Sequence, residues 1–262
     1  MEINLTGKTA IVCGSTQGIG KACALELASL GANIVLVARN NEKLQKVKNE
    51  LDVSKGQKHH TISVDFSFPP EVGKLMEDFI EFFGNVHILI NNTGGPKAGK
   101  AIDAKPEEFL HAFNMHLLSN HYLVQAVVPG MKEEQYGRII NIISTSVKQP
   151  LENLGVSNTI RGAVANWAKT LANELGEFNI TVNNVLPGAT NTSRLNEIIE
   201  NKAGKTGKSK AEILQSMCNA VPMKRIAEPG EIANAVAFLA SPAASYINGI
   251  NLPVDGGRTK SL

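Results

Sequence analysis

The stretch IVCGSTQGIGKA, residues 11–22, decides the fold. Its first residues are apolar and β-branched, which predicts a strand, and its last residues open a helical pattern that continues as IGKACALELASLGA. Between them, Gly14, Gly18 and Gly20 give the spacing G-x-x-x-G-x-G. Glycines in such a turn let the backbone bend sharply and let another group approach it closely. The chain is therefore predicted to begin with a strand, a glycine-rich turn and a helix.

The same alternation of strand and helix extends over the whole chain. It predicts an α/β fold, a doubly wound sheet of seven mainly parallel strands with helices on both faces. Two helical patterns end at a glycine, Gly31 and Gly176, as helices often do. We find no repeat or linker and expect a single domain over residues 1–262. The predicted strands are KTAIVCG (8–14), NIVLVAR (33–39), HTISVDF (60–66), VHILINN (86–92), GRIINIIS (137–144), ITVNNVLPG (180–188) and INLPVDGG (250–257).

The composition favours a small-molecule ligand. With 43% hydrophobic and 19% charged residues the chain can build one large core. A net charge of +2 without a basic stripe argues against nucleic acid or a membrane as partner. No apolar run approaches the roughly 20 residues of a spanning helix, and the N-terminus lacks a signal-peptide pattern. Cys13, Cys23 and Cys218 have no metal-binding spacing, so we expect core thiols in a cytoplasmic protein.

The glycine-rich turn predicts a phosphate site, because free N–H groups and the helix dipole bind an anion there. The alternative is an ordinary strand-to-helix turn. After the second strand the chain reads Ala38-Arg39-Asn40, where NAD-selective enzymes offer a carboxylate to the ribose 2′-hydroxyl. Arg39 can bind a 2′-phosphate, so NADP(H) is favoured over NAD(H), unless Arg39 is only a surface residue.

The basic stretch NKAGKTGKSKAE, residues 201–212, is interpreted as part of a mobile lid. Its GKT and GKS do not form a P-loop, which needs a glycine at position 199 or 202, where Ile199 and Lys202 stand. The surrounding region, residues 189–221, is expected to shape the substrate pocket. It carries no motif that identifies the substrate.

Taken together, several motifs resemble the short-chain dehydrogenase/reductase family almost from end to end. They are GSTQGIG (14–20), VDFS (64–67), NNTGG (91–95), NMHLLSN (114–120), GRIINIIS (137–144), LPG (186–188) and VDGG (254–257). The resemblance implies a Rossmann-type sheet, with Asp65 near the adenine and Pro187 to Thr192 near the nicotinamide. The family usually has Ala where Thr93 stands. The cofactor residues expected from the motifs and the resemblance are Gly14, Ser15, Thr16, Gln17, Gly18, Ile19, Gly20, Arg39, Asn40, Asp65, Phe66, Asn92, Thr93, Gly94, Arg161, Pro187, Gly188, Thr190 and Thr192.

The family's catalytic set is Asn-Ser-Tyr-Lys, and the resemblance places Asn114, Ser144, Ser157 and Arg161 at these positions. The following GAVANWAKTLANELGEF fixes the register, and the tyrosines Tyr122, Tyr136 and Tyr246 lie elsewhere. Lys169 is expected on the outside of the helix. The pattern S-x-x-x-R with GGP at 94–96 resembles a divergent subgroup similar to β-ketoacyl carrier-protein reductases.

Serine and arginine cannot repeat the chemistry of tyrosine and lysine. A serine hydroxyl is a poor proton donor, and a guanidinium keeps its proton at working pH. Arg161 is therefore expected to act electrostatically, on an alkoxide, the cofactor ribose or a substrate carboxylate. Lys148 and His116 are candidate donors, although a solvated lysine and a packing histidine are the favoured interpretations. The spacing of His111, His116 and His121 spreads them around a helix, so no metal site is expected.

The sequence is compatible with two functions. The leading one is an NADP(H)-dependent oxidoreductase interconverting a carbonyl and an alcohol with this atypical set. The alternative is a non-catalytic dinucleotide-binding sensor or assembly partner; nonredox chemistry has no support in the sequence. The substrate is expected to be a small molecule, and Arg161 hints that it is anionic, as Lys97 and Arg194 do if they turn inwards. By resemblance, the C-terminal segment packs subunits into a homotetramer, with a dimer as the alternative.

Overall fold

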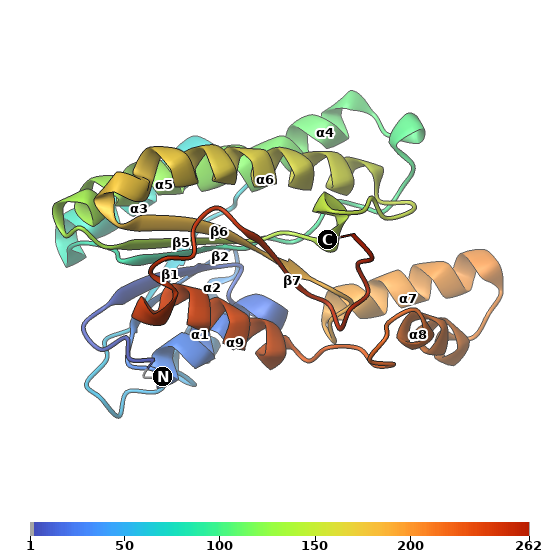
Figure 1. The fold of residues 1–262 in the computed structure, drawn as a ribbon, viewed down its shortest axis with the longest axis horizontal. Helices are drawn as coiled ribbons and strands as arrows, with labels where there is room; N and C mark the ends of the chain where they lie inside the picture. Colours follow the sequence, from blue (N-terminus) through green and yellow to red (C-terminus); the bar gives the residue numbers. More distant parts are fainter. Residues whose placement is uncertain (1–2, 262) are drawn as a thin grey trace.

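The structure, a computed structural model, describes residues 3–261 and is built on a seven-stranded parallel sheet (Figure 1). The strand order is β3-β2-β1-β4-β5-β6-β7, and every neighbouring pair is parallel. The predicted fold class is therefore confirmed, with each strand inside or close to its predicted range. The strands are β1 (Thr9–Cys13), β2 (Asn33–Ala38), β3 (His60–Ser63), β4 (Ile88–Asn91), β5 (Gly137–Ile142), β6 (Ile180–Pro187) and β7 (Asn251–Val254).

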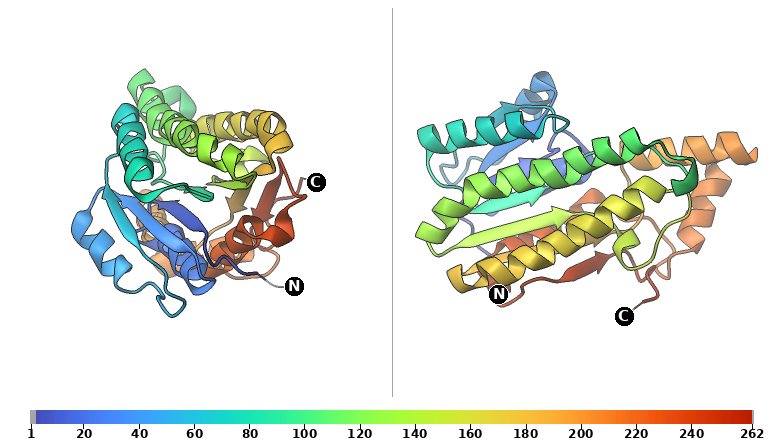
Figure 2. Two further views of the ribbon diagram at one scale, coloured as in Figure 1. Left: turned by 90° about the vertical axis from the view of Figure 1, so that its left-hand side faces the viewer. Right: turned by 90° about the horizontal axis from the view of Figure 1, so that it is seen from above.

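Helices cover both faces of the sheet, as the left view of Figure 2 shows. One face packs against α1, α2 and α9 through small and aliphatic side chains such as Ala24, Leu44 and Val236. The other packs against α3, α5 and α6 through residues such as Met76, Leu123 and Leu171. The helices are α1 (Gly18–Ser29), α2 (Asn41–Lys48), α3 (Pro69–Phe83), α4 (Pro106–Phe113), α5 (Ser119–Glu133), α6 (Gly155–Leu175), α7 (Ser193–Thr206), α8 (Lys210–Asn219) and α9 (Pro229–Ala240). Among residues 3–261, no helix combines the length and apolar character needed to cross a bilayer.

The strand order reverses direction between β1 and β4, which lie side by side in the middle of the sheet. In a doubly wound sheet, ligands bind beyond the carboxyl ends of the strands at such a switch point. Gly14 follows β1 and Asn92 follows β4. The two segments that carry predicted cofactor residues therefore meet where the topology leaves a crevice.

A row of four asparagine side chains crosses half of the sheet, which the sequence did not predict. Asn91, Asn141, Asn184 and Asn251 occupy matching positions on β4, β5, β6 and β7. Each Nδ2 donates to the Oδ1 of the next asparagine, at 2.9, 2.9 and 2.8 Å. Because buried amides need partners, this chain of hydrogen bonds fixes the register of the four strands where it crosses them, from the last residue of β4 to the first residue of β7.

Residues 189–221 contain two helices, α7 and α8, which extend to the right of the sheet in Figure 1. Residues 201–206, inside the predicted lid, continue α7, which ends at Gly207 with a φ of +70°. The Thr192 Oγ1 caps the start of α7 and the Ser209 Oγ that of α8. The prediction of core thiols holds for Cys13 and Cys23 but is wrong for Cys218, which is half-buried on α8.

Candidate functional site

The glycine-rich turn is held together by contacts that leave no room for side chains. Gly14 and Gly18 have φ angles of +59° and +54°, which only glycine adopts without strain. A Cβ on Gly20 would lie 2.2 Å from the Gly14 carbonyl oxygen, and one on Gly14 would lie 2.6 Å from the carbonyl oxygen of Asn92. Packing therefore requires glycine at positions 14 and 20. These residues lie at the N-terminus of α1, where the first backbone N–H groups of a helix have no partner within the helix.

Asn92 joins the turn to β4. Its Nδ2 donates to the backbone oxygens of Cys13 at 3.2 Å and Gly14 at 3.4 Å. Next to this junction, the fully buried Ser15 hydroxyl has no hydrogen-bond partner within residues 3–261. Gly94 has no atom close to the place of a Cβ, so this side of the crevice is open. A pyrophosphate fits this arrangement, because it takes hydrogen bonds from free N–H and O–H groups.

The opposite wall comes from the chain that follows β6. The Thr192 side chain lies against Gly18, 3.1 Å from the place of a Cβ. An open groove of about 400 Å³ lies between the N-termini of α1 and α7, and Lys21 and Ser193 take part in its lining. Thr190 is buried and its Oγ1 donates to the Gly188 carbonyl oxygen at 3.1 Å. The structure thus brings two predicted residues, Gly18 after β1 and Thr192 after β6, to one groove.

Arg39 and Asp65 lie together at the ends of β2 and β3. The Arg39 Nη1 is 3.6 Å from the Asp65 carboxylate, and the arginine side chain is 70% exposed, so it is free to turn towards a ligand. Partial burial acts to raise the pKa of Asp65. Hydrogen bonds from Ser67 and the charge of Arg39 together outweigh this effect, so the pKa lies below its usual value. Two predicted cofactor residues are otherwise engaged, since Asn40 caps α2 and the Phe66 side chain is buried in the core.

The remaining predicted cofactor residues differ in their access to a ligand. Gln17 is exposed, Thr16 is half-buried, and Ile19 packs against the core below the sheet. Pro187 is the last residue of β6, and a Cβ on Gly188 would lie 2.8 Å from the Asp255 Cα. Ile19 and Gly188 therefore hold the backbone in place on the two sides of the crevice, while the exposed Gln17 side chain is free to move.

Ser144 and Ser157 lie at the carboxyl edge of the sheet beside this crevice. Ser144 follows β5, and its Oγ accepts a hydrogen bond from the Ser146 N–H at 3.1 Å. Ser157 is half-buried in the first turn of α6. That turn is docked firmly, because Gly155 packs on Ala101 so closely that a Cβ would lie 2.3 Å from the Ala101 nitrogen.

Arg161 lies one turn further along α6, with 7% of its surface exposed. Its Nη1 donates to the Ile142 carbonyl oxygen at the end of β5, over a long 3.3 Å. Within residues 3–261 it forms no ion pair with a carboxylate. Burial lowers the pKa of Arg161 to about 10, so the guanidinium stays charged at neutral pH. A buried charge without a partner costs several kcal/mol.

The other buried arginine, Arg138 on β5, is compensated. Its Nη1 donates to the backbone oxygens of Gly137 at 2.8 Å and Asn179 at 3.1 Å. Its guanidinium also lies 4.4 Å from the ring centre of Tyr136, within the range of a cation–π contact. The Arg138 Nε is buried without a partner, and Arg138 forms no ion pair within residues 3–261, but its guanidinium still has more stabilising contacts than that of Arg161.

The segment after α4 carries Asn114 and His116 in a π-helical turn, Asn114–Leu118. Such turns are rare and often occur at functional sites. The buried His116 lies against Thr93, with 2.5 Å between Nδ1 and the threonine Oγ1. Burial, the charge of Arg161 and that of His111 hold the His116 pKa well below its usual value, so the ring is neutral. The sequence indicates Thr93 and His116 separately, and only the fold brings the two side chains together.

The other predicted basic residues do not gather around Arg161. Lys169 is exposed on α6, as predicted, and Lys97 is exposed as well. Lys148 is half-buried at the end of a short turn after β5. The Arg194 Nη2 donates to the Pro96 carbonyl oxygen at 2.6 Å, which ties α7 to the loop after β4. No three metal-ligating side chains come together in the described part of the chain.

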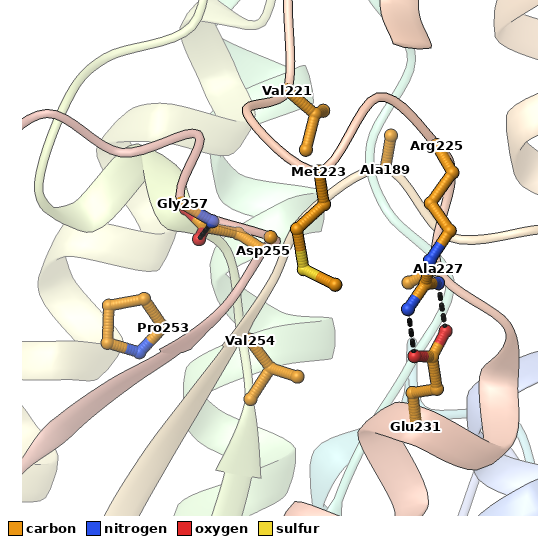
Figure 3. Close-up of a pocket in the computed structure, with 11 residues that line it drawn as sticks. Ala189, Val221, Met223, Arg225, Ala227, Glu231, Pro253, Val254, Asp255 and Gly257 are labelled. Carbon is orange, nitrogen blue, oxygen red and sulfur yellow. Dashed lines mark hydrogen bonds and ion pairs between the residues drawn. The ribbon is translucent and has the colours of Figure 1, made fainter.

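A cavity of about 260 Å³ lies beside the lid region, between the chain after α8 and the end of β7 (Figure 3). Met223 and Val254 point into it, and Ala189 contributes from the loop after β6. At its edge Arg225 donates two hydrogen bonds of 2.6 Å to Glu231. These bonds lower the pKa of Glu231 to about 2 and fix the segment after α8 to α9. The sequence does not predict this pair, because Arg225 and Glu231 belong to no motif.

Comparison with known proteins agrees with this geometry. Residues 14–259 match the family model described as enoyl-(acyl carrier protein) reductase. The chain is 33% identical to 7alpha-hydroxysteroid dehydrogenase of Escherichia coli, over 100% of this chain and 98% of that protein. It is 35% identical to the 3-oxoacyl-(acyl-carrier-protein) reductase FabG of Vibrio cholerae, over 97% and 98% of the two chains.

The chain is also similar to a protein of solved structure. The L-sorbose reductase of Gluconobacter frateurii, in complex with NADPH and L-sorbose, superposes with a TM-score of 0.94 at 33% identity over 100% of both chains. The fold, the glycine-rich turn at the switch point and the matches over the whole length point to one conclusion. The chain belongs to the short-chain dehydrogenase/reductase family, whose members found here are NAD(P)-dependent oxidoreductases.

Proposed function

We propose that this protein is an NADP(H)-dependent oxidoreductase that interconverts a carbonyl and an alcohol. The observation that carries the proposal is the position of two features at the same edge of the sheet. One is the glycine cradle at the β1–β4 switch point, and the other is the charged Arg161 beside Ser144, beyond β5. A phosphate-binding turn beside a buried cation suits a dinucleotide and a substrate that develops negative charge.

Gly14, Gly18, Ser15 and Asn92 would hold the pyrophosphate and the adenosine side of the cofactor. Pro187, Gly188, Thr190 and Thr192 would face the nicotinamide, which supplies or accepts the hydride when the cofactor is bound. NADP(H) is favoured because Arg39 is exposed and close to the Asp65 side of the crevice, where a 2′-phosphate would lie. The L-sorbose reductase, which is similar in structure, binds NADPH.

At the catalytic end, Asn114, Ser144, Ser157 and Arg161 stand where the resemblance gives the family its Asn, Ser, Tyr and Lys. Arg161 would supply positive charge near the reacting oxygen, and the two serine hydroxyls would donate hydrogen bonds to that oxygen. None of the three is a good acid, so the proton would come from water. Loss of a positioned acid typically reduces the rate roughly 10²–10⁴-fold. We therefore expect a slow enzyme.

The test is turnover of NADPH with a panel of aldehydes, ketones and oxoacids, together with NADP⁺ and the matching alcohols. Turnover that falls in Arg161→Gln while NADPH binding is retained would support the proposal. A protein that binds NADPH but oxidises or reduces nothing in the panel would contradict it.

A second candidate function is a non-catalytic dinucleotide-binding protein. It is favoured by the absence of a good acid in the Asn114, Ser144, Ser157 and Arg161 set. The double variant Ser157→Tyr with Arg161→Lys separates the two functions. A gain of several orders of magnitude over a negligible wild-type rate would favour the non-catalytic protein. A loss of measurable wild-type activity would favour the enzyme.

We propose in addition that the protein forms a homotetramer in the cytoplasm. The fully exposed Tyr246 lies in the C-terminal segment that the resemblance assigns to subunit packing. The free thiols suit a reducing compartment. Analytical ultracentrifugation of the wild type and Tyr246→Glu tests the assembly, and a monomeric wild type would contradict it.

A further inference from the structure

The Arg161 guanidinium is a buried cation whose hydrogen bonds are mostly unused. A guanidinium has five N–H donors, and only Nη1 of Arg161 finds an acceptor, the Ile142 carbonyl oxygen at 3.3 Å. Nε and Nη2 donate to no group within residues 3–261. They are nevertheless not sealed in the core, unlike Nε of Arg138. The unused donors are therefore accessible to a ligand that enters the crevice.

Nothing in the described part of the chain neutralises this charge. None of its carboxylates lies within ion-pair distance of Arg161, and burial alone accounts for the lowered pKa of the residue. The titratable neighbour His116 is neutral and adds no counter-charge. Arg138 has two hydrogen bonds to carbonyl oxygens and a cation–π contact, whereas Arg161 has one long hydrogen bond, so Arg161 is the buried arginine that has most to gain from an anion.

The cofactor phosphates are poorly placed to be this anion. The cradle for pyrophosphate follows β1, whereas Arg161 is bound to the end of β5, two strands away in the sheet. Neighbouring strands lie about 5 Å apart, so the two places are separated by about 10 Å across the sheet. The 2′-phosphate would lie still further away, beside Arg39 at the end of β2.

We propose that Arg161 binds the carboxylate of the substrate, and that the substrate is a short oxoacid or the corresponding hydroxyacid. A guanidinium and a carboxylate form two parallel hydrogen bonds, which would use the free donors and neutralise the charge. Ser144 lies two residues beyond Ile142 in extended backbone, about 7 Å along the chain, so a carbonyl that reaches Ser144 is a few bonds from the carboxylate. This inference rests on the proposed function, because it assigns the substrate of the same site.

The experiment measures the melting temperature of the full chain, with and without NADP⁺, in the presence of sodium acetate, pyruvate and acetoacetate at matched ionic strength. The neutral controls are acetamide, pyruvamide and acetoacetamide. We expect the carboxylates to raise the melting temperature saturably, by about 5 °C at roughly 100 times the dissociation constant, and the amides to have no effect.

Variants show whether Arg161 is responsible. Arg161→Gln should abolish the rise, and Arg161→Lys should reduce the affinity about tenfold because the planar fork is lost. Lys169→Gln is the matched control, since it removes the same charge from an exposed position on the same helix and should leave the rise unchanged. Arg161→Gln should also melt no lower than the wild type, because it removes a charge that has no partner.

Three results would overturn the inference. They are equal effects of amides and carboxylates, a rise that persists in Arg161→Gln, and a larger Arg161-dependent rise with inorganic phosphate than with any carboxylate. Failure of the proposed function is seen separately. If the protein does not bind NADPH but carboxylates still stabilise it through Arg161, the dinucleotide proposal fails and the anion site stands.

Discussion

The two ends of the crevice are built in opposite ways. At the β1–β4 end, backbone atoms touch each other where Gly14 and Gly20 lack side chains, and the shape itself prepares the site. At the β5–α6 end, side chains carry polar atoms without partners, namely the free donors of Arg161, the Ser146 hydroxyl and Nε2 of His116. The first end is specified chiefly by packing that no other residue can reproduce, with the Ser15 hydroxyl as its unpartnered side-chain group, and the second is specified chiefly by unused polarity. The following predictions test this difference.

The largest effect is expected from Gly20→Ala. The added Cβ would lie 2.2 Å from the Gly14 carbonyl oxygen, so the turn must move. We expect a loss of about 3 kcal/mol in the free energy of unfolding and roughly 100-fold weaker NADPH binding. Urea denaturation and calorimetry measure the two quantities. Gly204→Ala, at an open position on α7, is the control and should cost nothing. Wild-type affinity in Gly20→Ala would break the comparison.

Asn141→Ala should come next, because it interrupts the asparagine row that joins the two ends. It removes two hydrogen bonds and leaves the Asn91 Nδ2 and Asn184 Oδ1 buried without partners. We expect a loss of about 3 kcal/mol in stability, with NADPH affinity changed less than in Gly20→Ala. Asn251→Ala removes only the last hydrogen bond of the row and should cost about 1 kcal/mol. Equal losses of stability in Asn141→Ala and Asn251→Ala would show that a residue in the middle of the row contributes no more than the residue at its end.

The pH dependence of stability probes the unused polarity at the β5–α6 end. The His116 pKa is well below its ordinary value of 6.5, through burial and the charges of Arg161 and His111. As the pH falls, His116 therefore takes up a proton in the unfolded chain before it does so in the folded protein. The contribution of the neutral His116 to the free energy of unfolding is complete above pH 6.5 and is lost as the pH falls below this value. One such group gives a slope of at most about 1.4 kcal/mol per pH unit.

Urea denaturation between pH 7.5 and pH 5 measures this slope. The pKa values of His60 and His87 are also lowered, chiefly by burial, so both add to the slope in the same direction. His116→Gln should remove the share of His116 and leave theirs. An unchanged slope in this variant would mean that His116 is not held neutral by its surroundings.

The smallest effect is expected from Arg39→Ala, which changes an exposed side chain and no packing. An exposed charge contributes about 1 kcal/mol, so NADPH should bind roughly fivefold more weakly and NADH equally well. Added salt should reduce the difference between the wild type and the variant. An equal loss of affinity for both nucleotides would show that Arg39 does not contact the 2′-phosphate.

The sequence predicted the sheet well because periodicity and glycine spacing are local properties. All seven strands were found from runs such as GRIINIIS, and the glycine-rich turn was assigned from its own residues. The asparagine row was missed because it depends on the register between strands. The π-helical turn and the contact of Thr93 with His116 were missed because no pattern in one segment indicates its partner in another.

The sequence separates residues 201–206 from the helix before them, yet α7 continues to Thr206 and is followed by Gly207 in a left-handed conformation. At the catalytic end, the sequence indicates Arg161 as a site residue, but it does not show whether the guanidinium is buried or which groups it contacts. Whether a buried arginine is compensated is decided by carbonyl oxygens and aromatic rings from other elements, as Arg138 illustrates. Such information appears only when the strands and helices are packed together.

The most direct test of the central claim is calorimetric titration of the wild-type protein with NADPH and with NADH. The account predicts NADPH binding at micromolar concentration and about fivefold weaker binding of NADH, because only the former offers a 2′-phosphate to Arg39. If neither nucleotide binds at millimolar concentration, the glycine cradle does not hold a dinucleotide. Both proposed functions would then be wrong.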